Sequence, residues 1–154
     1  MPKVRPIPKG YNSITPYLVV DGADKAIAYY KKVFGAKELF RMPAPGGKIG
    51  HAELRIGDSV VMLADEWPQM GFKGPKAYGG AAVSILLYVE KCDAVYKKAL
   101  AAGGSEIKPM QDQFYGDRSG TFIDPFGHMW TVATHVKDVS PKDMKKAAAA
   151  MAKG

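Results

Sequence analysis

Two polar residues with the chemistry of an acid–base pair, His51 and Glu53, stand two positions apart in this chain. They alternate with the apolar residues Ala52 and Leu54, which is the pattern of a half-buried strand, so both side chains are predicted to share one face. An imidazole and a carboxylate at this spacing can exchange a proton with a ligand or supply two ligands of a displaced metal site. A polar, solvated strand face is the alternative interpretation.

Asp65 and His135 form a second predicted pair, because they are 70 positions apart and this offset recurs along the chain. In an unbroken strand His135 shares the face of Thr131, four residues earlier. An acid and a base at symmetric ends of one cavity would make a plausible polar pair. Solvated strand ends are the alternative.

Tyr115 and Arg118 flank Gly116-Asp117 at the entry of a predicted strand near the expected mouth of the cavity. A guanidinium can bind a carboxylate or phosphate through two parallel hydrogen bonds, and Lys48 is the corresponding cation in the first half. The alternative is a surface ion pair of Arg118 with Asp117 or Asp124, which would contribute little.

Aromatic and sulfur-containing side chains gather between the two halves, where Trp67 is the first of a group that could wall an apolar pocket. The other members of this group are Met70, Phe72 and Tyr78, with Met62 and Trp130 on strands. Core packing explains Met62 and Trp130 equally well, whereas the aromatic linker is expected to fold over the pocket or a dimer interface.

The elements that position these residues occur twice. The run from Ile14 to Asp24 returns 69 positions later as the run from Val83 to Asp93, and Gly46, Gly50 and Gly57 return after 70. A repeat of this length indicates two copies of one supersecondary unit with a site between them. Each copy is predicted to be β-α-β-β-β, which makes the fold α+β.

Turn residues and hydrophobic periodicity set the expected boundaries. The first copy is predicted as strand 13–20, helix 25–34 with Asp24 as N-cap, and strands 37–41, 48–55 and 59–64. The second is predicted as strand 82–89, helix 93–102 with Asp93 as N-cap, and strands 106–111, 116–123 and 129–134. Within one domain over 1–154, the modules span 12–66 and 82–136, with a linker at 67–81 and a helical tail at 137–154 that begins after Ser140.

The composition is that of an ordinary globular protein, with 154 residues, 47% hydrophobic and 24% charged. The formal net charge is +7, but the lysines are scattered, which argues against nucleic acid as a partner. No apolar run approaches the roughly 20 residues of a membrane span. A lone cysteine, Cys92, and no apolar leader favour the cytoplasm.

The duplicated unit, together with the turn Asp124-Pro125-Phe126-Gly127-His128, resembles the vicinal oxygen chelate superfamily of glyoxalases, bleomycin-resistance proteins and extradiol dioxygenases. The segments 51–59 and 115–120 carry the same resemblance, which is strongest for the phosphonate-operon-associated branch. It implies two open half-barrels around a concave cavity, and a homodimer. Exposed sheet edges also favour dimerisation.

The resemblance further implies four metal-ligand positions, which correspond here to Thr15, Val61, Ser84 and Thr131. None is a good ligand for a divalent metal, because such sites are built from imidazole, thiolate and carboxylate groups. The expected function is therefore to bind a small molecule in a cavity without metal or other cofactor. The alternative is a metal-dependent lyase, isomerase or dioxygenase with a site repositioned around His51 and Glu53.

Overall fold

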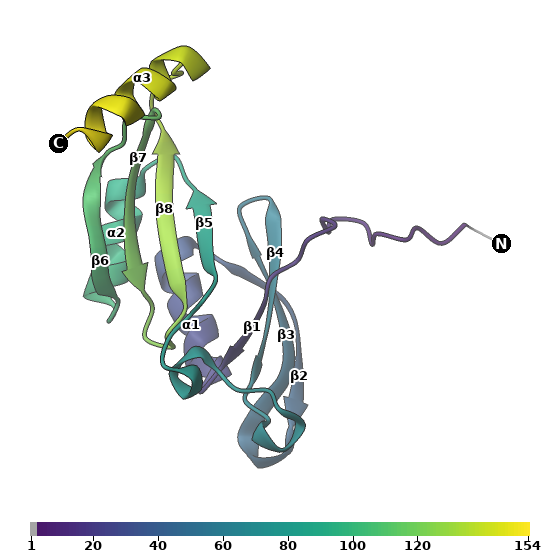
Figure 1. Cartoon of the computed structure of the whole chain (residues 1–154). Coiled ribbons are helices and arrows are strands. Elements are labelled where there is room, and N and C mark those ends of the chain that lie inside the picture. Colours follow the sequence, from purple (N-terminus) through teal and green to yellow (C-terminus); the bar gives the residue numbers. More distant parts are fainter. Residues whose placement is uncertain (1–2) are drawn as a thin grey trace. The chain divides into compact units, whose positions relative to one another are not determined.

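The computed structural model describes residues 3–154 and contains the β-α-β-β-β unit twice (Figure 1). This confirms the predicted α+β fold of two tandem modules. The first copy consists of β1 (Tyr17–Val20), α1 (Ala23–Phe34), β2 (Lys37–Ala44), β3 (Lys48–Ile56) and β4 (Ser59–Asp65). The second consists of β5 (Ser84–Tyr88), α2 (Cys92–Ala101), β6 (Ser105–Asp112), β7 (Asp117–Ile123) and β8 (Met129–His135), followed by the tail helix α3 (Pro141–Ala152).

Each copy forms its own open four-stranded sheet. The strand orders are β1-β4-β3-β2 and β5-β8-β7-β6, so the first and last strands of each copy are neighbours. Those neighbours run parallel, and the remaining pairs are antiparallel. The helix of each copy provides the long crossover that a parallel pair requires.

The chain divides into two compact units, and these do not follow the repeat boundaries everywhere. Among the described residues, unit 1 contains 3–82 together with 125–128, the turn between β7 and β8; unit 2 contains 83–124 and 129–154. Within unit 1 this turn places the ring of Phe126 edge-on to Tyr29 and brings His128 Nε2 within 3.0 Å of the Val19 carbonyl oxygen. His128 therefore connects this turn to β1 through a hydrogen bond between its side chain and the backbone.

One face of each sheet packs against its helix and forms the core of its unit. In unit 1, Leu54 and Leu63 are fully buried on the sheet face that packs against α1, and α1 contributes Ile27 and Tyr30. In unit 2, Phe122, Trp130 and Val132 are equally buried, together with Tyr96 and Ala99 of α2. Burying one large apolar side chain contributes about 1.5–3 kcal/mol, so these helix-facing positions hold each unit together.

The helix caps differ from the sequence prediction. Asp24 and Asp93 lie in the first turn of their helices rather than at the N-cap, and neither cap residue, Gly22 or Lys91, makes a side-chain cap hydrogen bond. Strand residues far away in the sequence take this role instead. Asp65 on β4 accepts the N–H groups of Gly22 and Ala23, both at 2.9 Å.

In unit 2, Thr134 on β8 is the corresponding residue. Its Oγ1 accepts the N–H of Cys92 at 3.1 Å and donates to the Val89 carbonyl at 2.7 Å. The first orphan N–H groups of a helix need an acceptor, and in both copies the last strand of the sheet supplies it. A cap provided across the fold leaves no local sequence signal.

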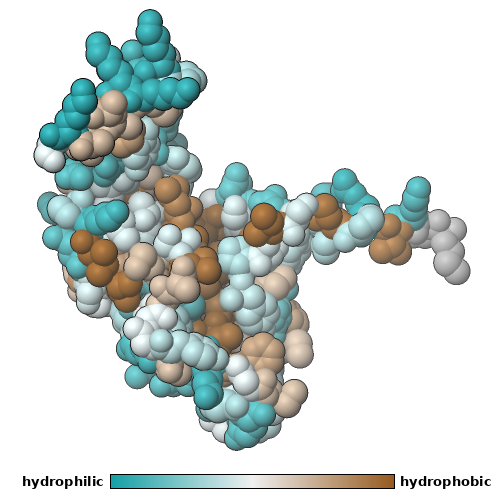
Figure 2. All heavy atoms as spheres, viewed as in Figure 1, coloured by the Kyte–Doolittle hydropathy of each residue, from teal (hydrophilic) through white to brown (hydrophobic). Residues whose placement is uncertain are grey.

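The tail helix begins as predicted. Ser140 is the N-cap, its Oγ accepts the Asp143 N–H at 3.1 Å, and Pro141 is the first helical residue. None of the helix residues is buried, and polar side chains dominate its surface in Figure 2. No helix within residues 3–154 is long and apolar enough to span a membrane.

Candidate functional site

The face of unit 1 opposite α1 carries a group of polar side chains. Strand register identifies this open face: Met62 on β4 pairs with Glu53 on one side and with Tyr17 on the other, so these three share a face. His51 shares it too, two residues from Glu53 on the same strand. The prediction that His51 and Glu53 share one face of the strand agrees with this register.

The structure joins four of these side chains into one hydrogen-bonded chain. The Tyr17 hydroxyl lies 2.9 Å from His51 Nδ1, and His51 Nε2 lies 3.1 Å from Glu53 Oε1. The Tyr11 hydroxyl donates to the other carboxylate oxygen, Oε2. We call Tyr17, His51, Glu53 and Tyr11, in this order, the tyrosine–histidine–glutamate relay.

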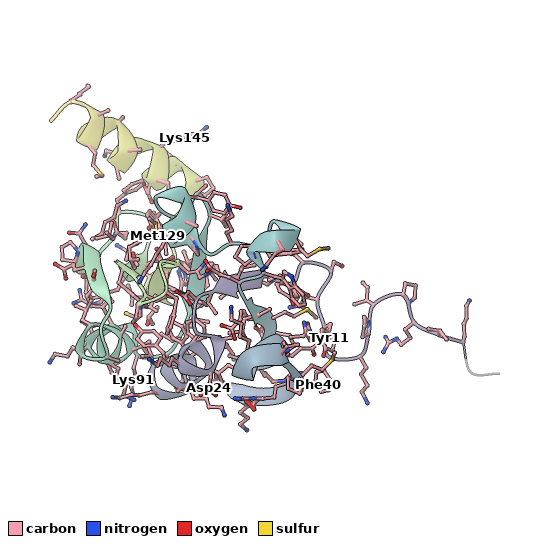
Figure 3. The ribbon with its side chains drawn as sticks, turned by 90° about the horizontal axis from the view of Figure 1, so that it is seen from below. Tyr11, Asp24, Phe40, Lys91, Met129 and Lys145 are labelled. Carbon is pink, nitrogen blue, oxygen red and sulfur yellow. The ribbon has the colours of Figure 1, made fainter. Side chains whose placement is uncertain are left out.

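Aromatic and apolar groups surround the relay. The ring of Phe40 on β2 packs 6.3 Å from that of His51, and the ring of Tyr17 lies at 5.5 Å on another side. Figure 3 labels Tyr11 and Phe40, which come from the N-terminal segment and the edge strand β2. The side chains of His51 and Glu53 remain 24% and 15% exposed, so the relay is partly shielded from water yet accessible.

The hydrogen bonds and burial shift the proton affinities of three members. The bond from Tyr11, with a smaller contribution from His51, lowers the pKa of Glu53 below its ordinary value. That same bond raises the pKa of Tyr11. Burial, followed by the nearby Glu53 charge, raises the pKa of Tyr17. At neutral pH the relay therefore contains one carboxylate and two protonated phenols.

A cavity of about 900 Å³ opens beside the relay, and Tyr17 belongs to both. Its walls come from the ends of β1 and β4, the β2–β3 turn and the first part of the linker. Trp67 and Phe72 pair as a short antiparallel bridge, and both line the cavity, as does Met70. Tyr78, another aromatic residue of the linker, lies outside the lining.

Asp65 also lines the cavity, but the structure gives it a structural task. In addition to its two contacts at α1, its Oδ2 accepts the N–H of Ile49 at 2.7 Å. Three backbone N–H groups thus hold the carboxylate at the positive end of α1. Its neighbour Glu66 accepts the Gly74 N–H at 2.8 Å, which fastens the linker to β4.

The open face of unit 2 carries a different cluster. His135 Nδ1 lies 2.8 Å from Asp117 Oδ1, whose other oxygen accepts the Tyr88 hydroxyl at 2.8 Å. His135 Nε2 lies 2.7 Å from Asp138, in the segment that leads to α3. The bonds to Asp117 and then Asp138 raise the pKa of His135. Nearby, the hydroxyls of Thr131 and Thr121 bond to each other at 2.8 Å.

The contacts of Arg118 place it on the other side of the sheet. Arg118 pairs in register with Thr134, the residue that caps α2, so both face the helix. Its guanidinium holds the Asp93 carboxylate through two bonds of 2.8 Å and contacts Asp112 at 3.2 Å. The predicted surface partners Asp117 and Asp124 are therefore not those observed. Tyr115 stacks edge-on against Phe114, with ring centroids 5.2 Å apart.

The strand pairing also corrects one of the four metal-ligand positions that the family resemblance implied. Tyr17 pairs with Met62, and Leu86 with Thr131, so the last strands of the two copies match at an offset of 69 rather than 70. Met62 is thus the equivalent of Thr131. Val61 is buried with Leu54 on the face toward α1.

The corrected set, Thr15, Met62, Ser84 and Thr131, still contains no imidazole, carboxylate or thiolate. The same change of offset pairs Asp65 with Thr134, the two helix caps, and not with His135. Within residues 3–154, no three His, Cys, Asp or Glu side chains come together as a group that could hold a metal ion.

Sequence reasoning missed Tyr17 and Tyr11 as members of the relay. Tyr17 had a signal, because it stands two residues after Thr15 and so belongs to the same predicted strand face. Tyr11 had none, since it precedes the first strand in a proline-rich segment and reaches Glu53 only through the tertiary fold.

Comparison with known proteins agrees with the fold described above. The family model of the Glyoxalase/Bleomycin resistance protein/Dioxygenase superfamily matches residues 10–132. The uncharacterized protein Mb0911c of Mycobacterium bovis is 43% identical over 145 residues, which cover 92% of this chain and 95% of that protein.

Two solved structures are similar in both sequence and fold. Protein PA1353 from Pseudomonas aeruginosa is 28% identical with a TM-score of 0.66, and the match covers 82% of this chain and 99% of PA1353. TioX from Micromonospora sp. ML1 is also 28% identical with a TM-score of 0.62, over 81% of this chain and 99% of TioX.

Proposed function

The chain belongs to the Glyoxalase/Bleomycin resistance protein/Dioxygenase superfamily, and we propose from this that it binds a small molecule with a planar ring in the cavity of unit 1. The observation that carries the proposal is the cavity itself. Its volume of about 900 Å³ lies within the range of drug-sized ligand pockets, and Tyr17, Trp67 and Phe72 give it aromatic walls.

Few polar groups of the cavity are free to contact a ligand. The carboxylates of Asp65 and Glu66 accept backbone N–H groups, as described above. Lys48 also lines the cavity, and no ion pair holds its ammonium group among residues 3–154. A ligand whose ring lies against the aromatic walls and whose acceptor or anionic group meets Lys48 fits this arrangement.

The proposal requires no metal. The positions that would hold one in related enzymes carry two Thr, one Ser and one Met, and both ring nitrogens of His51 are within hydrogen-bonding distance of other side chains. A metal centred on His51 and Glu53, as in the alternative of a metal-dependent lyase, isomerase or dioxygenase, would have to break one of these bonds.

The direct test is a ligand screen by isothermal titration calorimetry with two variants of the wall. Trp67→Ala and Phe72→Ala should each weaken binding at least about tenfold, since each removes a large aromatic contact area. Both residues are about half exposed, so the fold should tolerate the change. Tyr78→Ala, in the same linker but outside the lining, is the matched control.

Metal analysis separates the binder from the alternative. Protein purified without chelator should carry far less than one equivalent of transition metal, and ligand binding should survive treatment with EDTA. A near-stoichiometric metal that is lost in His51→Ala would instead support the alternative of a metal-dependent enzyme.

The proposal includes a homodimer in the cytoplasm. The apolar side chains of Leu39, Phe40 and Met42 are about half exposed on β2, an edge strand whose unpaired backbone groups invite a second copy. The one cysteine, Cys92, is free and buried, which suits a reducing compartment. Sedimentation equilibrium should give twice the chain mass, and Leu39→Lys should reduce it to the monomer.

A further inference from the structure

The hydrogen-bonding capacity of each group in the relay determines where its protons lie. Glu53 is ionised at neutral pH and can only accept, so its two contacts must be donors: the Tyr11 hydroxyl at Oε2 and the His51 Nε2–H at Oε1. A neutral imidazole with its proton on Nε2 has a lone pair on Nδ1. The Tyr17 hydroxyl therefore donates to Nδ1, at 2.9 Å.

The direction of this hydrogen bond determines what the Tyr17 hydroxyl can offer to a ligand in the cavity. The proton of the Tyr17 hydroxyl is used by His51, so the phenolic oxygen can offer only its lone pairs to a ligand. The arrangement repeats the logic of an activated hydroxyl, in which a base contacts the hydroxyl and a third group orients the base. Here Glu53 orients His51, and Tyr11 in turn fixes Glu53.

We propose that the relay accepts a proton from an aromatic or enolic hydroxyl group bound in the cavity, and so holds this ligand as its anion. This rests on the proposed function and deepens it by naming the ligand class. The ligand O–H bond breaks as an O–H bond forms on Tyr17. The original Tyr17 proton moves to His51 Nδ1, and the resulting imidazolium pairs with the Glu53 carboxylate.

The surroundings favour this charge separation. Lys48 lines the same cavity and supplies a positive charge for the bound anion. Because its pKa is raised, Tyr17 is protonated both before and after the transfer. Tyr17 therefore passes a proton on, and His51 holds it. The groups packed around the relay from other strands, Phe40, Met42 and Met62, carry no charge.

Other charged groups around the relay and cavity leave the direction of transfer unchanged. Arg55 lies on the same face of β3 and acts on Tyr11, at the far end from the cavity. Asp65 and Glu66 line the cavity, and the backbone N–H groups that they accept partly offset their negative charge.

4-Nitrophenol is a suitable probe, because it is planar, carries one phenolic hydroxyl and turns yellow when that hydroxyl ionises. Equilibrium dialysis measures how much probe binds, and absorbance reports how much of the bound probe is ionised. In the wild-type protein the apparent pKa of the bound probe should fall by about 1–2 units, the size of shift that a favourable nearby charge produces.

Tyr17→Phe keeps the aromatic wall and removes the hydroxyl. In this variant the fall in pKa should be lost, and the affinity for the ionised probe relative to the neutral probe should drop about 10–100-fold, the change that a shift of 1–2 units entails. Tyr88→Phe removes a tyrosine hydroxyl contact to a carboxylate, that of Asp117, in unit 2 and should behave as the wild type. His51→Gln should abolish the pKa shift because it removes the proton acceptor.

The outcomes distinguish the two proposals. Probe that binds to the wild type with an unchanged pKa overturns the relay and leaves the binding function intact. An equal shift in Tyr17→Phe also overturns it. If neither 4-nitrophenol nor any other planar ligand binds while circular dichroism shows folded protein, the proposed function itself is refuted.

Discussion

The open faces of the two units carry similar side chains put to different uses. Unit 1 joins Tyr17, His51 and Glu53 in mid-sheet beside a cavity of about 900 Å³. Unit 2 joins a tyrosine, an aspartate and His135, but the histidine is the last residue of β8 and bridges to the segment before α3. The first cluster adjoins a cavity, whereas the second ties down the tail.

The helix-facing sides of the same two sheets show much less divergence. In both copies the last strand caps the helix, through Asp65 in unit 1 and Thr134 in unit 2, and apolar side chains fill the space beneath it. Packing and orphan N–H groups impose the same requirement on each copy. The open face is under no such requirement, so it is the side on which the copies can acquire separate functions.

The largest effect should come from Gly116, where unit 2 fastens its tail. Gly116 has φ +98°, and a Cβ there would lie 1.9 Å from the Lys137 carbonyl oxygen. Its own carbonyl accepts the N–H groups of Val136 and Lys137 at 2.9 and 3.0 Å. Gly116→Ala should therefore lower the free energy of unfolding by about 3 kcal/mol or more, measured by urea denaturation.

Gly57→Ala in unit 1 is the matched control for that substitution. Gly57 also has positive φ, +59°, but a Cβ there would meet nothing within 4 Å. Backbone strain alone should cost about 1–2 kcal/mol. Equal losses of unfolding free energy for the two variants would mean that the backbone around Lys137 can move away from an added Cβ at no energetic cost. The close contact between Gly116 and Lys137 would then not stabilise the tail of unit 2.

The two helix caps should differ by a smaller amount. Asp65→Ala leaves three backbone N–H groups without their acceptor and should cost about 2–3 kcal/mol, whereas Thr134→Ala frees one and should cost about 1 kcal/mol. Urea denaturation at neutral pH measures both, and Asp65→Asn, which retains one acceptor oxygen, should fall between them. A larger loss for Thr134→Ala would reverse the ranking of the two caps.

Local patterns in the sequence predicted the elements well. Alternation placed β3, and Ser140 with Pro141 marked the start of α3. The repeat located the two copies because apolar strand residues recur at an offset of 69 and glycines at turns recur at an offset of 70. These features depend on neighbours in the chain, which a sequence displays directly.

The features that failed depend on contacts across the fold. The caps of α1 and α2 come from strands about 40 residues away, and the helix-side position of Arg118 follows from strand register. An offset of 70 instead of 69 moved the predicted ligand position from Met62 to Val61, because a shift of one residue turns a side chain to the other face. Only part of the relay could be predicted, because His51 and Glu53 alternate within one strand whereas Tyr11 comes from a segment outside the sheet.

The smallest effect, and one that separates the units by its sign, is the pH dependence of their carboxylate–histidine clusters. His135 has a pKa raised by Asp117 and Asp138, so the folded state binds its proton more tightly than the unfolded chain does. Its contribution to stability is fully present below the unfolded pKa of about 6.5 and is lost as the pH rises through the raised value. The difference in unfolding free energy between wild type and His135→Gln should therefore shrink on alkalinisation.

Glu53 in unit 1 should show the opposite trend. Its pKa is lowered by Tyr11 and His51, so its contribution is present above the unfolded value and is lost as the pH falls through the folded one. Urea denaturation of Glu53→Gln and His135→Gln over a pH series measures both trends. His135 is half exposed, so solvent screening keeps its effect small. Two curves with the same sign would show that the clusters do not differ in the way their hydrogen bonds indicate, and a flat His135→Gln curve would show that Asp117 and Asp138 bind the neutral ring as well as the charged one.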